Sequence, residues 1–104
     1  MAVLVEIHVP MTDDIEWIDD IGDYLIDLED ELGLEEYDDG EQYGDVYIFF
    51  IAGASERTLL AAASRVATRK GVPAGAFAMV TTTDAPQFGM GRRVNLPVGS
   101  RIGS

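Results

Sequence analysis

The residues best suited to acid–base chemistry in this sequence are Glu6 and His8, and His8 is its single histidine. They are two positions apart in a segment that reads as a strand, so both side chains are expected on the same face. If that face lines a pocket, the pair could act as a general base and its neighbour, or as part of a metal site. The competing interpretation is a histidine that makes only a structural hydrogen bond.

A cofactor-free enzyme or small-molecule-binding protein could be built from this pair. In a dimeric α+β barrel, two sheets would face each other around an apolar cavity lined by His8, Glu6 and Tyr47. Such a cavity should bind a small hydrophobic molecule.

Other catalytic chemistry finds little support. The chain has no cysteine, which excludes disulfides, thiolate nucleophiles and cysteine-bound metals. No serine lies in the G-x-S-x-G pattern of a nucleophile elbow. The acidic stretch 38–45 lacks the alternating aspartates and the final glutamate of a calcium-binding loop. We therefore predict no metal site and no cofactor.

Arg92 and Arg93 follow the stretch Gly89-Met90-Gly91 and could together hold a phosphate or a partner's carboxylate. This stretch does not lead from a strand into a helix and lacks the G-K-[ST] sequence, so it predicts no nucleotide-binding loop. Two solvated arginines on a glycine-rich hairpin are the alternative interpretation.

Segregated charge is the strongest pattern in the chain. The 104 residues contain 19 Asp and Glu against seven Lys and Arg, which gives a net charge of −12. Residues 13–45 hold 16 of the acids and no Lys or Arg, whereas all seven bases come from Arg57 onward. This excess of acid argues against direct binding to nucleic acid or to an anionic membrane, and it favours a basic partner.

The acidic residues predict a surface that docks on a basic protein surface, such as the nucleic-acid-binding face of an enzyme. The protein would then be an interaction module, an inhibitor or regulator, and not an enzyme. The alternative is a solvated surface that aids solubility or adaptation to salt. The candidate contacts lie on a predicted helix and in the turn after it: Asp20, Asp23, Asp27, Asp30, Glu31, Asp38, Asp39 and Glu41.

Two elements are predicted in the first third of the chain. Alternating apolar side chains predict a half-buried strand over Val3–Val9. Apolar residues at every third or fourth position then predict an amphipathic helix over Asp13–Leu32. Asp13 and Glu16 have the spacing of a capping box at its start, and Gly33 is suited to end it.

The middle of the chain predicts a turn-rich segment and a central strand. Residues 35–42 are polar, with Asp39-Gly40 as a tight turn or bulge, and could form a short edge strand. Asp45–Ala52 is β-branched and aromatic, with apolar side chains on both of its alternating faces. Such a strand is expected in the centre of a sheet that is covered on both sides.

The last third predicts a helix and two strands. Ser55 is a suitable N-cap for a helix that ends before Gly71. Ala76–Thr83 is predicted as a strand, residues 84–91 as a loop, and Arg92–Leu96 as a possible fifth strand. The resulting order is the βαββαβ arrangement of a ferredoxin-like α+β sandwich with a possible extra C-terminal strand.

This arrangement has a consequence for assembly. Both helices would cover one sheet face and leave the other open, although Asp45–Ala52 has apolar side chains to bury on each. The open face would then be covered by residues 87–104, a second copy of the chain or a ligand. We expect a homodimer that forms through the open sheet face.

Length and composition predict a single α+β domain over residues 1–97 and a flexible C-terminal tail over residues 98–104. The sequence has no apolar run long enough to span a bilayer and no secretory leader. A soluble, cytoplasmic protein is expected.

Three segments carry a resemblance to known proteins: Tyr37-Asp38-Asp39-Gly40-Glu41, Gly44–Phe50 and Arg92–Leu96. With the second predicted helix between them, they resemble small uncharacterised bacterial ferredoxin-like proteins. More remotely, they are similar to the family of the regulator of ribonuclease E activity B, acidic proteins that inhibit this ribonuclease. The resemblance implies a non-enzymatic inhibitor or regulator that acts through an acidic surface, and it assigns no individual residue.

Overall fold

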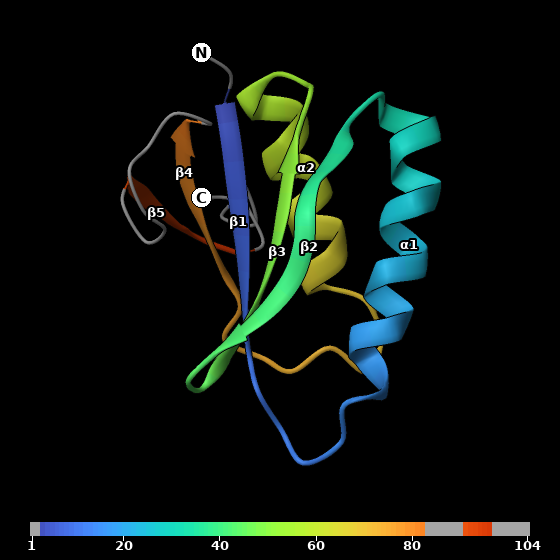
Figure 1. Ribbon diagram of the computed structural model, residues 1–104, viewed down its shortest axis with the longest axis vertical. Coiled ribbons are helices and arrows are strands. Elements are labelled where there is room, and N and C mark those ends of the chain that lie inside the picture. The colour runs from blue at the N-terminus through green and yellow to red at the C-terminus, as the bar shows by residue number, and fades with distance from the viewer. Residues whose placement is uncertain (1–2, 83–90, 97–104) are drawn as a thin grey trace, which may run out of the picture.

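Two helices pack against a five-stranded antiparallel sheet in the computed structural model, which describes residues 3–82 and 91–96 (Figure 1). The elements in chain order are β1 (Val3–Pro10), α1 (Glu16–Leu32), β2 (Glu35–Tyr43), β3 (Val46–Ala52), α2 (Glu56–Ala67), β4 (Phe77–Thr82) and β5 (Arg92–Asn95). The sheet order is β2-β3-β1-β4-β5, and each neighbouring pair is antiparallel. The predicted α+β class is confirmed, and a fifth strand is present.

Strand β1 lies in the middle of this sheet and is paired on both sides. Its residue Glu6 is opposite Phe50 of β3 and Met79 of β4. Its residue His8 is opposite Ile48 and Phe77 in the same way. Because opposed residues point to the same side, these residues share one face of the sheet.

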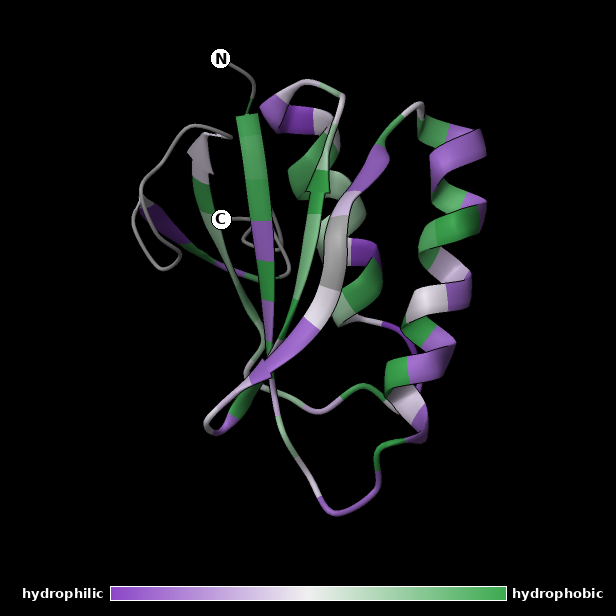
Figure 2. Cartoon of the chain, in the orientation of Figure 1, coloured by the Kyte–Doolittle hydropathy of each residue, from purple (hydrophilic) through white to green (hydrophobic). Residues whose placement is uncertain are grey.

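The main core lies between the helices and the other face of the sheet. It contains the alternate residues Val5, Ile7 and Val9 of β1, all with no exposed surface. The apolar stripe of α1 supplies Ile21, Leu25 and Leu28, and α2 supplies Leu59 and Val66. Burying such a side chain contributes about 1.5–3 kcal/mol. Figure 2 shows the hydrophilic residues of α1 along its outer side, away from the sheet.

A second, smaller cluster lies on the sheet face that carries Glu6 and His8. It is formed by Leu4, Ile48, Phe50 and Ala52, each 7% exposed or less. The two-sided apolar character predicted for β3 is thus confirmed. These side chains are already buried within one chain, so their burial does not require a second copy, and the homodimer stays a prediction.

Helix α1 begins at Glu16, later than the predicted Asp13. The N-cap is Ile15, and its side chain makes no capping bond. The carboxylate of Asp14 accepts a hydrogen bond of 3.0 Å from the backbone N–H of Glu16. The predicted capping box at Asp13 is therefore wrong, because Asp14 accepts the backbone hydrogen bond at the start of the helix.

The other two predicted helix signals are confirmed. The N–H of Gly33 donates to the carbonyl of Glu29, with the left-handed φ of 75° that favours glycine. The hydroxyl of Ser55 accepts from the N–H of Thr58 at the start of α2. Neither helix in the part of the chain that the structure describes is long and apolar enough to cross a membrane.

Strand β2 is longer than its polar sequence predicts. It runs for nine residues, with register irregularities between Glu36 and Asp38 and between Asp38 and Glu41. The second irregularity confirms the bulge expected at Asp39-Gly40. A Cβ on Gly40 would lie 2.6 Å from Cε1 of Tyr47, so a close approach of this ring favours glycine here. The length was missed because backbone pairing with β3 does not require apolar side chains.

Two predicted segments lie outside the described residues. They are most of the predicted loop, residues 84–90, and the predicted tail, residues 98–104.

Candidate functional site

Acidic side chains gather on one side of the molecule. Helix α1 lies next to the β2 edge of the sheet, and β5 forms the opposite edge (Figure 1). The acids of α1 and β2 therefore lie far from the arginines of β5. The separation of charge along the sequence is thus kept in space between α1 and β5, whereas Arg65 and Arg69 of α2 contact acids of α1.

Three of the eight predicted contacts, Asp23, Asp27 and Asp30, lie on the outer side of α1. We define the outer face of α1 as Asp19, Asp23, Ile26, Asp27 and Asp30, all exposed. None of these aspartates takes part in an ion pair within the described residues. Like charges three or four positions apart cost about 0.2–0.5 kcal/mol per pair in a helix.

Asp20 and Glu31 do not belong to this unpaired surface. Asp20 forms two hydrogen bonds with Arg69, at 2.9 Å and 3.0 Å. Glu31 forms an ion pair with Arg65 at 2.6 Å. These hydrogen bonds lower the pKa of both carboxyl groups. Helix α2 thus supplies a counter-charge for both acids, and their contact with a partner stays a prediction.

Tyr24 completes this contact between the helices. The guanidinium carbon of Arg69 lies 3.9 Å from the centroid of its ring, and that of Arg65 lies 5.7 Å away. Arg65 also donates from Nε to the hydroxyl of Tyr24 at 3.0 Å. Bonds to Glu31 and Asp20 raise the pKa of Arg65 and Arg69 respectively. We call Asp20, Tyr24, Glu31, Arg65 and Arg69 the α1–α2 clamp.

Sequence reasoning missed the clamp. The one available signal was the spacing of Arg65 and Arg69, which are four residues apart and so lie on one face of α2. Their partners on α1 are more than 30 positions away in sequence, so only the tertiary packing identifies them.

The remaining predicted contacts lie in β2. Glu41 is exposed, and its carboxylate accepts a hydrogen bond of 2.5 Å from the hydroxyl of Tyr43. Asp38 and Asp39 belong to the strand, but their side chains lie outside what the structure describes.

Glu6 and His8 are brought together as predicted. Oε1 of Glu6 lies 2.9 Å from Nε2 of His8. Glu6 is 1% exposed and His8 is 8% exposed. A buried carboxylate is expensive unless it is paired, so this contact offsets part of the cost of placing Glu6 in the middle of the sheet.

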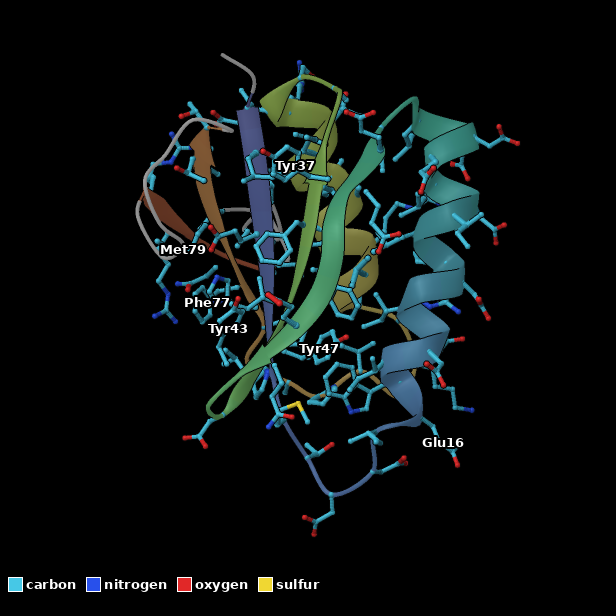
Figure 3. The ribbon with its side chains drawn as sticks, in the orientation of Figure 1. Glu16, Tyr37, Tyr43, Tyr47, Phe77 and Met79 are labelled. Atoms are coloured by element: carbon cyan, nitrogen blue, oxygen red, sulfur yellow. The ribbon has the colours of Figure 1, made fainter. Side chains whose placement is uncertain are left out.

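An aromatic stack continues from His8 toward the sheet edge. The rings of His8 and Phe77 are nearly parallel, with 4.7 Å between their centroids. The guanidinium carbon of Arg93 lies 3.9 Å from the centroid of Phe77. Figure 3 shows Phe77 on the same side of the sheet as Met79 and Tyr43. Phe77 was not predicted as a site residue, because its role depends on the register between β1 and β4.

Tyr47 does not join this pair, so the predicted grouping of Glu6, His8 and Tyr47 is wrong. Tyr47 is opposite Val9, one position out of phase with His8. Its ring therefore lies on the helix side of the sheet, edge-on to Trp17 with 6.4 Å between the ring centroids. The labelled ring is visible between the sheet and α1 in Figure 3.

Arg92 and Arg93 do not form a joint anion site. Arg92 pairs with Glu56 of α2 at 2.5 Å, whereas Arg93 lies over Phe77. Neighbouring residues of a strand point to opposite faces, so the two guanidinium groups diverge. Gly89 and Met90, which precede them, lie outside the described residues.

The described residues contain no group of three or more His, Asp or Glu side chains placed to hold a metal ion. No family model matches the chain, and neither a curated protein nor a solved structure matches it.

Proposed function

We propose that this protein is a small acidic interaction module that docks on a basic surface of a partner protein. The observation that carries this proposal is the outer face of α1, whose exposed aspartates have no ion-pair partner within the described residues. The nearby cations Arg65 and Arg69 are held by Glu31 and Asp20, so they do not neutralise this face.

The module would act by covering the basic surface of its partner. A concentrated negative surface attracts a positive one over a Debye length and speeds its association. A surface that binds nucleic-acid phosphates through Lys and Arg is one such positive surface. Covering it would inhibit or regulate the partner without chemistry on the part of the module.

The resemblance to ferredoxin-like regulators agrees with this proposal. The first four strands lie in the order β4-β1-β3-β2, with α1 and α2 as the connections between β1 and β2 and between β3 and β4. This order supports the assignment to the ferredoxin-like arrangement, with β5 as an addition at the β4 edge. The docking surface would be formed by α1, since Glu41 of β2 is opposite Ile48 and so lies on the helix-free face of the sheet.

The test starts from the purified chain on a column, loaded with host extract at low salt and eluted with a salt gradient. We expect a strongly basic protein to elute and, after purification, to bind with an association rate that falls steeply with salt. Replacing Asp23 and Asp27 by asparagine should lower that rate about tenfold at low salt.

Asp45→Asn is the matched control, since Asp45 is an exposed aspartate in the turn between β2 and β3. It should leave the rate nearly unchanged. Retention of no basic protein, or equal rates for all variants at every salt concentration, would overturn the proposal.

A second function is favoured by the buried pair of Glu6 and His8. We propose as the alternative that two copies pack their helix-free sheet faces together, with this pair beside a cavity for a small hydrophobic molecule. Sedimentation should then give a dimer, and a hydrophobic dye should bind the native chain but not the His8→Ala variant. This alternative would be excluded if the chain is a monomer at every concentration and does not bind the dye.

A further inference from the structure

Gly22 lies in the middle of α1, where a glycine is unfavourable. It destabilises a helix relative to alanine because its backbone loses more freedom on folding. Its φ is not among the positive values that favour glycine. A Cβ built on Gly22 would meet no atom within 4 Å. Nothing in the described chain therefore requires a glycine at this position.

The position next to it on the helix surface is also unusual. Ile26 follows Gly22 by four residues, so the two lie one above the other along α1. Ile26 is 59% exposed, the most of any large apolar side chain described. Gly22 thus leaves backbone without a side chain, next to a projecting apolar side chain.

Carboxylates lie along one side of Gly22 and Ile26 on the helix surface. Asp19 and Asp23 lie within one turn of Gly22, and Asp23 and Asp30 lie within one turn of Ile26. All three are exposed and unpaired by the described cations. These residues follow one another along the helix axis. They therefore fit an elongated partner element that has an apolar stripe with positive charges beside it.

We propose that Gly22 and Ile26 are the contact point for a cationic amphipathic helix of the partner. This inference rests on the proposed function, since it names the element that the acidic surface binds. Small residues let two helices approach closely, and a side chain of the partner would fill the space over Gly22. Ile26 would pack into the partner's apolar stripe, as anchors do in helix recognition. Lysines or arginines beside that stripe would reach Asp19, Asp23 and Asp30.

Gly22→Ala separates binding from folding. The added methyl group meets nothing in the chain, so the variant should gain helix stability and a Tm higher by about 3 °C. The same methyl group occupies the open space over the Gly22 backbone, so partner binding should weaken. A glycine with only a structural role would not give these opposite signs.

The probe is a synthetic peptide of lysine and leucine, about 18 residues or five helical turns long, with its leucines on one face. A peptide of the same composition, with its leucines spread around the helix, is the control. Binding of both is measured by calorimetry at low and moderate salt. We expect the amphipathic peptide to bind at least about tenfold more tightly than the control.

Chain variants complete the test. Gly22→Ala and Ile26→Ala should each weaken the amphipathic peptide about fivefold to tenfold at both salt concentrations. Ile15→Ala is the comparison: Ile15 is 55% exposed but lies three turns, about 16 Å, before Ile26. Ile15→Ala should weaken binding of the amphipathic peptide less than Ile26→Ala does.

The results distinguish two failures. In the first, both peptides bind equally tightly, their affinity falls with salt, and Gly22→Ala and Ile26→Ala leave it unchanged. The proposed helix contact is then wrong, but acidic docking stands. If neither peptide binds the native chain at low salt, the proposed function fails together with this inference.

Discussion

The guanidinium of Arg69 lies over the ring of Tyr24, with its carbon 3.9 Å from the ring centroid, while Asp20 holds its edge. This contact ties the acidic helix α1 to α2 at a point where α1 has few other polar contacts. Together with the buried stripe of α1, it holds this helix in place although its carboxylates repel one another. The aromatic ring and the two ion pairs of the α1–α2 clamp fix the angle at which the outer face of α1 is presented.

Tyr24→Leu should lower the free energy of unfolding by about 1 kcal/mol, because it removes the cation–π contact with Arg69 and the hydroxyl that Arg65 bonds. Urea denaturation followed by circular dichroism measures this change. Tyr24→Phe keeps the ring and should lower the free energy of unfolding by less. If Tyr24→Leu and Tyr24→Phe are equally stable, the ring contact does not stabilise the helix pair.

The α1–α2 clamp also predicts a dependence of stability on pH. Arg69 lowers the pKa of Asp20 from its ordinary value of 3.8, and Arg65 lowers that of Glu31 from 4.5. A lowered pKa in the folded state means that the unfolded state binds more protons, so stability rises with pH in this range. The contribution is present above about pH 4.5 and is lost as the pH falls through the lowered values.

The measurement is a comparison between the native chain and the double variant Asp20→Asn/Glu31→Gln at several pH values. Their difference in stability should be constant at neutral pH and shrink below about pH 4. All other carboxyl groups are the same in both proteins, so their effect cancels. A difference that stays constant down to pH 2 would contradict the role of these pairs.

His8→Ala should lower the free energy of unfolding by about 2–3 kcal/mol, because the buried carboxylate of Glu6 loses a hydrogen-bond partner. Chemical denaturation tests this. The double variant Glu6→Gln/His8→Ala should recover part of the loss, since an amide costs less to bury than a carboxylate. Additive losses in this double-mutant cycle would show that the two side chains do not interact.

Gly91→Ala should have the opposite sign to Gly22→Ala. A Cβ on Gly91 would collide with the carbonyl oxygen of Val80, and the φ of 125° is strained for any other residue. We expect a loss of about 2 kcal/mol and faster hydrogen exchange in β5, which would separate from β4. Unchanged exchange at Arg93 and Val94 would contradict this.

Local patterns in the sequence predicted most of the elements but not how they combine. The spacing of Ile21, Leu25 and Leu28, three or four positions apart, was sufficient to predict helix α1, since these residues form its buried stripe. The two-sided apolar character of β3 was sufficient for a strand covered on both faces. Such patterns depend on neighbours in the chain, so they can be read directly.

The candidate site was predictable only in part, because its composition depends on register and tertiary pairing. Alternation within one strand was enough to place Glu6 beside His8. It was not enough for Tyr47, because a shift of one position between strands moves a side chain to the other face. The pairing of Asp20 with a residue of α2 required the crossing of two helices, which no local pattern contains.

The irregular edge at β2 bears on what the protein does at high concentration. A nine-residue edge strand is a template on which identical chains can stack into fibrils, since its outer backbone groups have no neighbour in the sheet. Two bulges distort this template, and the exposed Glu35, Glu36 and Glu41 repel the same residues of an approaching copy. The negative charge along this edge thereby keeps the molecule from polymerising with itself.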